Sequence, residues 1–260
     1  MDDLIQWPEA TYWNKPWNAW LGCRPISPAC DNCYARCATI DRFGQSFEPH
    51  RTNKKSPPQS GVVFCGNMTD LWGDWISKEE SMSILDKLFY FDPHGGGKRP
   101  FDATYLFCTK RVGNMLITLR DYPEVPNAYF GFTAENQEWF NRRVDHAAAI
   151  PFRHKLWLSA EPLLGPIDMG DMVEMFKWVA VGCESGANRR PCKLEWIESI
   201  VEQCRAANVP VFVKQIDLNG KCERDITKFP KHLQIRQVPW FRQVLQGRAE
   251  EGNMADGREV

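Results

Sequence analysis

Residues 103–132 read ATYLFCTKRVGNMLITLRDYPEVPNAYFGF, and this stretch decides the fold class. Two short apolar runs, at 103–108 and 128–132, enclose a segment at 111–120 whose apolar residues recur at helical spacing. Continuous apolar runs bounded by turn residues are typical of strands that are buried on both faces. A strand, a helix and a second strand in this order predict one unit of a parallel sheet.

The same alternation extends along most of the chain. Further apolar runs lie at 62–65 (VVFC), 155–158 (KLWL), 178–181 (WVAV) and 209–213 (VPVFV), and residues 20–22 are expected to end an earlier strand. A first helical pattern follows a capping box at Ser77 and Glu80, and its apolar stripe runs to Phe89. Two further helical patterns occupy 137–149 and 194–207. Six or seven such units predict an α/β fold built as a full or partial (β/α) barrel.

The bulk numbers limit the class of protein. The 260 residues, 43% of them hydrophobic, suffice for one large domain, which we expect at 1–240, followed by a polar and disordered tail at 241–260. The net charge of −1 gives no overall attraction to nucleic acid. With no membrane-spanning run and no signal pattern, a cytoplasmic protein without a membrane partner is expected. In that compartment we expect its ten cysteines not to form a disulfide framework.

Polar residues cluster where each predicted strand ends. They occur at 66–70 (GNMTD), 109–111 (TKR), 133–136 (TAEN), 159–161 (SAE), 182–186 (GCESG) and 214–215 (KQ). Helix caps account for any one of these clusters. Acidic residues after three successive strands, beside a lysine and an arginine, favour a shared site at the carboxyl ends of the strands. Lys110, Arg111, Arg189, Arg190 and Lys214 are candidate anchors for carboxylate or phosphate groups.

Three cysteines within eleven residues form the most specific motif. Cys23, Cys30 and Cys33, in CRPISPACDNC, have the spacing C-x6-C-x2-C, and Cys37 follows four residues later. Three thiolates can hold three irons of a [4Fe–4S] cluster and leave the fourth iron open for another ligand. Four thiolates can instead hold zinc, and the thiols can also be unligated. We expect Cys37 to lie one helical turn beyond Cys33 and to face the core.

Several segments together resemble a phage-encoded, radical-SAM-like family of otherwise unknown function. They are WNAWLGCRPISPACDNCYA (17–35), CGNMTDLWGDW (65–75), YFGFTAENQ (129–137), LWLSAEPLLGPI (156–167), WVAVGCESGANRRP (178–191) and VPVFVKQ (209–215). The chain departs from the C-x3-C-x2-C spacing of most radical-SAM enzymes. Cys183 stands where the family often has glycine, and 66–70 lacks the usual Gly-Gly-Glu.

The resemblance implies a radical-SAM barrel with two cofactors, a [4Fe–4S] cluster on Cys23, Cys30 and Cys33, and S-adenosylmethionine on the fourth iron. The residues that it implies for cofactor binding are Gly66, Asn67, Met68, Thr69 and Asp70 after the second strand, Thr133, Glu135 and Asn136 after the fourth, and Ser159. Glu161, Glu184 and Lys214 are assigned to the substrate side, as catalytic residues.

The implied activity is formation of a 5′-deoxyadenosyl radical that abstracts hydrogen or starts a rearrangement, as in an isomerase or mutase. A hypermodified thymine base of phage DNA, or its nucleotide precursor, is the suggested substrate, in the cytoplasm of the host. A small reductant protein such as flavodoxin or ferredoxin would supply the electron. Two alternatives stay open: a zinc-stabilised nucleic-acid-binding module without catalysis, and a cluster enzyme without radical chemistry.

Overall fold

The computed structural model describes residues 6–42, 44–54, 56–92, 97–186 and 188–240, so the predicted tail at 241–260 lies outside the described residues. Its main feature is one eight-stranded sheet. In spatial order the strands are β1 (Lys15–Trp17), β4 (Gly61–Cys65), β7 (Ala103–Thr109), β8 (Ala128–Thr133), β9 (Lys155–Ala160), β10 (Phe176–Gly182), β11 (Val211–Leu218) and β12 (Lys221–Glu223). All neighbours are parallel except β11 and β12.

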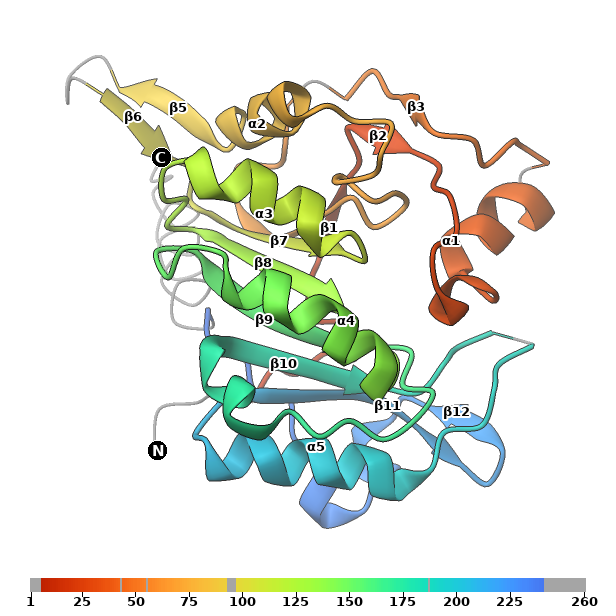
Figure 1. The fold of residues 1–260 in the computed structure, drawn as a ribbon. Coiled ribbons are helices and arrows are strands. Elements are labelled where there is room, and N and C mark those ends of the chain that lie inside the picture. Colours follow the sequence, from red (N-terminus) through yellow and green to blue (C-terminus); the bar gives the residue numbers. More distant parts are fainter. Residues whose placement is uncertain (1–5, 43, 55, 93–96, 187, 241–260) are drawn as a thin grey trace, which may run out of the picture.

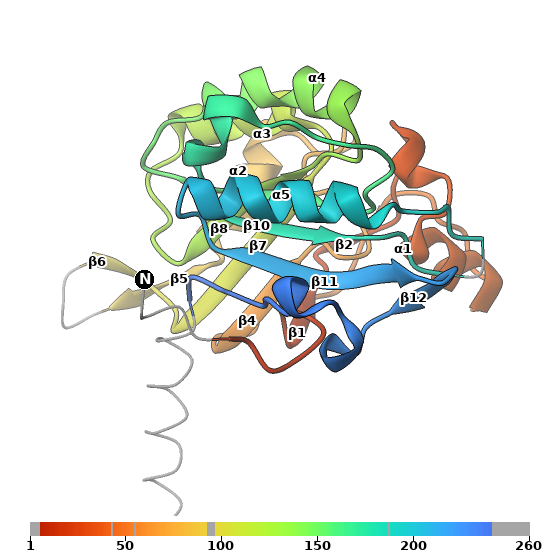
Figure 2. The same cartoon turned by 90° about the horizontal axis from the view of Figure 1, so that it is seen from below.

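The sheet curls into a half-barrel with helices on its outer face (Figures 1 and 2). These helices are α2 (Lys78–Asp86), α3 (Val112–Asp121), α4 (Gln137–Ala148) and α5 (Leu194–Ala206). Between β9 and β10 the chain forms only a short 3-10 helix, η3 (Gly170–Met175). The predicted α/β class and the predicted strand and helix alternation are confirmed.

Local signals in the sequence explain where the helices begin. Ser77 caps α2, since its Oγ accepts a hydrogen bond from the N–H of Glu80 at 3.2 Å, as the capping box predicts. The inward faces of the helices then pack on the outer face of the sheet, burying residues such as Leu85, Phe140 and Ile200. Burial of these apolar stripes, more than intrinsic propensity, stabilises the helices.

A second, aromatic core fills the lower part of the inner, concave face. Trp157 and Trp178 project from β9 and β10, and their ring centroids lie 4.9 Å apart. Tyr12 and Trp240, from the two ends of the described chain, pack against Trp178 at 4.8 Å each. The inner face is therefore filled with aromatic side chains at its base.

The first parallel strand is not the one that the sequence predicted. β1 ends at Trp17, whereas Trp20–Leu21 forms β2, which pairs with β3 (His50–Arg51) in a separate antiparallel ribbon. Gly22 follows with φ +82°, a conformation that suits glycine, and its N–H donates to the Met68 carbonyl at 3.1 Å. The expectation that residues 20–22 end a strand of the main sheet is wrong, because the chain has already left that sheet.

A hairpin and a last strand were also missed. Helix α2 ends at Asp86, short of the predicted stripe, and Phe89–Asp92 forms β5. β5 pairs with β6 (Gly97–Pro100) in an antiparallel hairpin that the sequence analysis did not predict. β12 adds an antiparallel strand at the edge beside β11. Short edge ribbons of this kind carry weak hydrophobic patterns, so periodicity does not reveal them.

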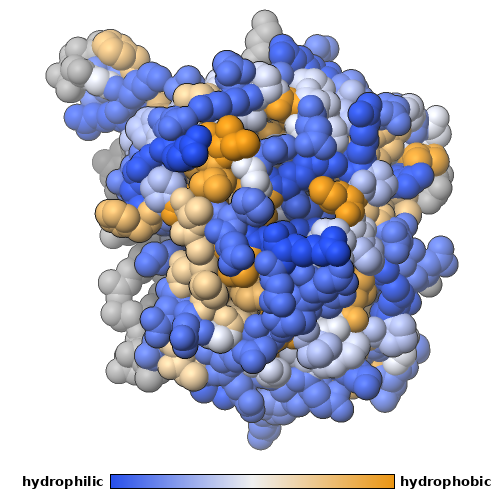
Figure 3. All heavy atoms as spheres, in the orientation of Figure 1, coloured by the Kyte–Doolittle hydropathy of each residue, from blue (hydrophilic) through white to orange (hydrophobic). Residues whose placement is uncertain are grey.

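The surface adds two observations. On the face drawn in Figure 3, hydrophobic residues form small separate groups rather than one large patch. Within the described ranges, no helix combines the length and the apolar character that crossing a membrane requires.

Candidate functional site

The three motif cysteines lie on one loop at the carboxyl ends of the strands (Figure 1). We call residues 22–33 the cysteine loop; it contains η1 (Pro28–Cys30) and leads into α1 (Tyr34–Cys37). Cys23, Cys30 and Cys33 are free and partly exposed. Cys37 donates its N–H to the Cys33 carbonyl at 3.0 Å, one turn further on as expected, but it is exposed to solvent. The expectation that Cys37 faces the core is wrong.

The predicted cofactor segment 66–70 contacts the start of this loop. Gly66 turns the chain at the end of β4 with φ +78°. The Thr69 hydroxyl donates to the Gly22 carbonyl at 2.6 Å, and the N–H of Gly22 donates to the Met68 carbonyl. Asn67 accepts a bond from Asn18 at 2.7 Å and, through its carbonyl, one from the Tyr34 hydroxyl. This segment fixes the loop where it begins.

Asp70, the last residue of that segment, pairs with a buried arginine. The Arg111 guanidinium lies 3.3 Å from Asp70 Oδ2, and Thr109 donates to Oδ1 at 2.7 Å. Arg111 Nη2 also donates to the carbonyl of Arg24, on the cysteine loop, at 3.0 Å. Burial lowers the pKa of Arg111, but the charges of Asp70, Cys23 and Asp74 together outweigh burial and raise it.

Glu135 forms a second pair of this kind. Its side chain is fully buried, and Oε2 accepts a bond from Arg143 of α4 at 2.7 Å. Its other oxygen, Oε1, faces the N–H of Ala29 on the cysteine loop at 3.4 Å. The next residue, Asn136, caps α4 by accepting the N–H of Trp139 at 3.1 Å. A direct cofactor contact by Glu135 or Asn136 remains a prediction, since both side chains already have these structural partners.

Glu184, after β10, forms the third pair. Arg190 binds both of its carboxylate oxygens, at 2.5 and 3.0 Å, and Asn32 of the cysteine loop donates to Oε2 at 3.0 Å. Arg190 also donates to the Pro28 carbonyl at 2.9 Å and lies 3.2 Å from Asp31. Burial raises the pKa of Glu184, but the hydrogen bonds from Arg190 outweigh burial and bring it below its ordinary value.

A separate polar group lines the carboxyl-end half of the inner face. Strand alternation continues the inner-face pattern of Leu106 and Trp157 two residues further, to Cys108 and Ser159. The inner-face group, as we define it, comprises Tyr12, Cys108, Lys110, Thr133, Ser159, Glu161 and Lys214. Cys108 Sγ lies 3.5 Å from the Thr133 hydroxyl, which joins β7 to β8 on this face.

An ion pair joins two of the predicted substrate residues within that group. Lys214 Nζ lies 2.7 Å from Glu161 Oε2 and 5.2 Å above the centroid of the Tyr12 ring. Glu161 Oε1 is buried and finds no hydrogen-bond partner among the described residues. Burial raises the pKa of Tyr12 well above its usual value, and the charge of Glu161 adds to this. A buried acceptor without a donor is costly, so this oxygen is suited to receive one from a ligand or a water.

Lys110 connects the inner-face group to the cysteine loop. Burial lowers the pKa of its ammonium, but the negative charges of Cys30, Cys108 and Cys33, as thiolates, raise it overall. Lys110 Nζ forms no ion pair within the part of the chain that the structure describes, whereas Lys214 is paired with Glu161. Lys110 therefore remains a candidate anchor for an anionic group.

The ligand type that the loop offers, thiolate sulfur, is the type that binds iron–sulfur clusters. Soft thiolates are the usual ligands of such clusters, and the three thiols share one loop. In the described residues no three His, Cys, Asp or Glu side chains converge into a group that could hold a metal ion. Cluster binding would therefore require the three cysteine side chains to move toward one another.

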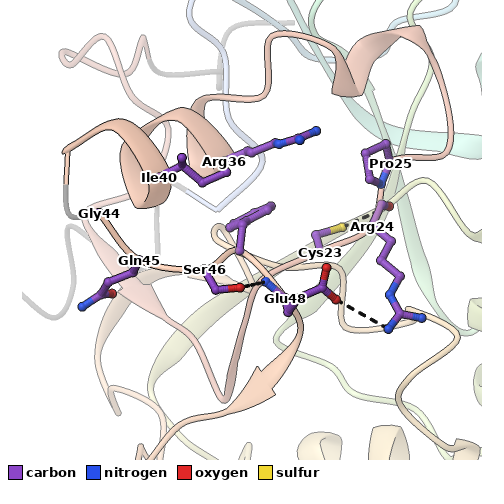
Figure 4. Close-up of a pocket in the computed structure, with 10 residues that line it drawn as sticks. Cys23, Arg24, Pro25, Arg36, Ile40, Gly44, Gln45, Ser46 and Glu48 are labelled. Carbon is purple, nitrogen blue, oxygen red and sulfur yellow. Dashed lines mark hydrogen bonds and ion pairs between the residues drawn. The ribbon is translucent and has the colours of Figure 1, made fainter.

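A cleft of about 460 Å³ opens on the outer side of the loop (Figure 4). Cys23, Arg24 and Pro25 line one wall, and Arg36 and Ile40 line another. Arg24 reaches across to Glu48 at 3.6 Å. This cleft gives solvent a direct approach to the Cys23 side of the loop.

Sequence reasoning missed three residues of the site. Tyr12 lies before the first predicted strand, and no pattern marks it. Cys108 could have been found, because it continues the inner-face alternation of β7 two residues after Leu106. Arg143 could also have been found, because it lies between Phe140 and Val144 on the apolar stripe of α4, where a charge needs a partner.

Fold and site together define an α/β half-barrel protein that carries a three-cysteine loop at the carboxyl ends of its parallel strands. By sequence, the chain belongs to the family described as "Protein of unknown function (DUF5131)", whose model matches residues 4–260. A search of curated proteins finds no match, and neither does a search of solved structures.

Proposed function

We propose that this protein is a radical S-adenosylmethionine enzyme, with a [4Fe–4S] cluster on Cys23, Cys30 and Cys33. The observation that carries the proposal is the proximity of two groups at one edge of the parallel half-barrel. The cysteine loop and the inner-face group meet at residues 110–111, where Arg111 donates to the Arg24 carbonyl of the loop at 3.0 Å and Lys110 of the inner-face group directly precedes it. The half-barrel is, in this proposal, of the radical-SAM type.

The position of the loop in the chain supports this. The loop lies in the connection that follows β1, and residues 66–70 follow β4, the second parallel strand. The resemblance assigns the cluster and the cofactor's amino group to these two places. When bound, the cluster would supply one electron, and S-adenosylmethionine would be cleaved to methionine and a 5′-deoxyadenosyl radical that takes hydrogen from the substrate.

The chain's own residues would orient the substrate and keep water away from it. Glu161 Oε1 would accept an N–H or O–H of the substrate, while Lys214 holds the carboxylate in place through Oε2. Lys110 would hold an anionic group of the cofactor or substrate. The aromatic core beneath, with Trp157 and Trp178 fully buried, closes the lower end of the inner face to water.

The substrate class follows the resemblance. A hypermodified thymine base of phage DNA, or its nucleotide precursor, has both ring N–H groups and anionic phosphates. These suit Glu161 Oε1 and Lys110 respectively. A base within duplex DNA would have to be flipped out of the stack to reach the inner face. Flavodoxin or ferredoxin is the proposed electron donor, and the host cytoplasm the proposed compartment.

Metal analysis after anaerobic purification tests this proposal. Iron and sulfide in about equal amounts, near four of each per chain, with brown colour, support it. A colourless protein with stoichiometric zinc would support the zinc-stabilised module instead. A further titration with S-adenosylmethionine should perturb the electron paramagnetic resonance spectrum of the reduced cluster, because an open iron is available to bind it. An unperturbed spectrum would contradict the open iron.

A further inference from the structure

Three ion pairs from different strand ends hold the backbone of the cysteine loop. Arg111, just after β7, donates to the carbonyl of Arg24 at 3.0 Å. Arg190, which follows β10, donates to the carbonyl of Pro28 at 2.9 Å. Glu135, after β8, accepts the N–H of Ala29 at 3.4 Å. These contacts span 87, 162 and 106 residues of sequence, so only the folded half-barrel creates them.

Each group that holds the loop is itself held by an opposite charge. Asp70 holds Arg111, Arg143 holds Glu135, and Glu184 holds Arg190. The planar guanidinium has several donors in fixed directions, so it can bind a carboxylate and a loop carbonyl at once. Arg190 illustrates this, because it binds Glu184, Asp31 and Pro28 together. Arg111 and Arg190 each contact a second carboxylate as well, Asp74 at 3.3 Å and Asp31 at 3.2 Å.

The points of attachment alternate with the thiols along the loop. Arg24 directly follows Cys23, and Ala29 directly precedes Cys30. Asn32, which donates to Glu184 at 3.0 Å and to the Asn188 carbonyl at 2.8 Å, directly precedes Cys33. Each thiol is therefore next to a residue whose backbone or side chain is fixed to the half-barrel.

We infer that Asp70–Arg111, Glu135–Arg143 and Glu184–Arg190 are positioning pairs that order the cysteine loop before any metal binds. Fixing a loop costs conformational entropy, and these contacts offset that cost during folding instead of during metal binding. Convergence of the thiols then needs rotation of cysteine side chains on an ordered backbone. The inference rests on the proposed function only in taking the thiols to be metal ligands.

The inference changes the role of three residues predicted to touch cofactor or substrate. Asp70, Glu135 and Glu184 act through the loop, and their loss should lower metal affinity. By contrast, Glu161 and Lys214 lie in the inner-face group and form no hydrogen bond with the loop backbone in the part of the chain that the structure describes, so their loss should leave metal affinity unchanged. Measurement of metal affinity therefore distinguishes the two sets of residues.

Cobalt titration of the metal-free protein tests this without iron or S-adenosylmethionine. Co²⁺ added anaerobically gives a thiolate-to-cobalt charge-transfer band. The absorbance that wild type shows and a C23A/C30A/C33A variant lacks measures Co²⁺ bound by the cysteine loop. Arg190→Met should weaken loop affinity for Co²⁺ about tenfold to a hundredfold, the range expected for lost hydrogen bonds to charged groups. The matched control is Arg189→Met, because Arg189 pairs with Asp217 and does not contact the loop in the described structure. Its affinity should stay within twofold of wild type.

Two further variants make the result decisive. Asn32→Ala removes two loop contacts at a partly exposed position and should weaken Co²⁺ binding even if Arg190→Met fails to fold. Arg190→Lys keeps the charge but cannot reach all the same acceptors, so its affinity should be intermediate. Folded variants, judged by circular dichroism, that keep wild-type Co²⁺ affinity would overturn the inference. Wild-type protein that binds Co²⁺ through the loop but assembles no iron–sulfur cluster would overturn the proposed function and leave the positioning pairs standing.

Discussion

Four cysteines fall within fifteen residues, but their surroundings differ. Cys23, Cys30 and Cys33 lie on the loop that the three positioning pairs hold, and all three are partly buried. Cys37 is the last residue of α1 and is exposed to solvent. These environments separate three candidate ligands from a fourth thiol that faces solvent.

Alanine variants of these cysteines should therefore fall into two groups. Cys23→Ala, Cys30→Ala or Cys33→Ala should each reduce iron content after anaerobic reconstitution by at least about fivefold, because a cluster held by two thiolates is labile. Cys37→Ala should retain most of the iron. Iron and sulfide analysis of the four variants measures this, and equal loss in all four would instead indicate a four-cysteine site.

Glu161 and Lys214 should affect the substrate rather than the cofactor. Glu161→Gln keeps the shape but weakens the acceptor, and Lys214→Met leaves Glu161 without its cation. We expect product formation to fall at least about tenfold, while uncoupled cleavage of S-adenosylmethionine changes less than about threefold. Parallel losses of both rates, at normal cluster content, would show that the pair does not distinguish substrate from cofactor.

Glu184 gives a pH dependence of stability whose sign follows from its environment. Its pKa in the folded protein lies below the ordinary value of about 4.3, so folding favours the ionised form. The stabilisation is fully present above the pKa of the unfolded state, and it is lost as pH falls through the folded-state pKa. Wild type should exceed Glu184→Gln in free energy of unfolding by about 1–3 kcal/mol at pH 6, and by less near pH 3.5. Urea denaturation at both pH values measures this, and a constant difference would contradict it.

At the scale of elements, a close packing of two strands makes one glycine essential. A Cβ at Gly131 of β8 would lie 2.3 Å from the ring of Trp157 on β9. Trp157 cannot move aside easily, because it is fully buried and donates to the Phe107 carbonyl at 2.9 Å. Gly131→Ala should therefore destabilise the fold by about 1–3 kcal/mol, the usual cost of overpacking.

Gly113 in α3 provides the matched control. A Cβ there would meet only the His146 ring, at an ordinary 3.8 Å. Gly113→Ala should leave stability unchanged or raise it by up to about 1 kcal/mol, since alanine is the better helix former. Thermal denaturation of both variants tests the pair, and similar melting temperatures would contradict the packing of β8 against β9.

Elements with strong local signals were predictable from the sequence. β7, β8 and α3 occur almost where residues 103–132 indicate, because buried strands and an amphipathic helix leave clear apolar patterns. β1 was not predictable, since three residues that include Pro16 carry no pattern. The sequence also indicated which strand ends bear carboxylates. It could not reveal that Asp70 pairs with Arg111, because 41 residues separate them and only the fold brings them together.

At the scale of the whole molecule, the two faces of the half-barrel are covered differently. Its outer face packs against α2 to α5 (Figure 2). The base of its inner face is closed by aromatic residues. The carboxyl-end edge is left to hold the cysteine loop above the inner-face group. In our account, this arrangement places a reactive centre over a substrate site that is closed from below.

The most direct test of that account is anaerobic incubation of the reconstituted protein with dithionite and S-adenosylmethionine, followed by chromatography and mass spectrometry. The account predicts 5′-deoxyadenosine and methionine in equal amounts from wild type and from Cys37→Ala, and none from Cys30→Ala. Absence of 5′-deoxyadenosine from wild-type protein that carries a full [4Fe–4S] cluster would contradict it.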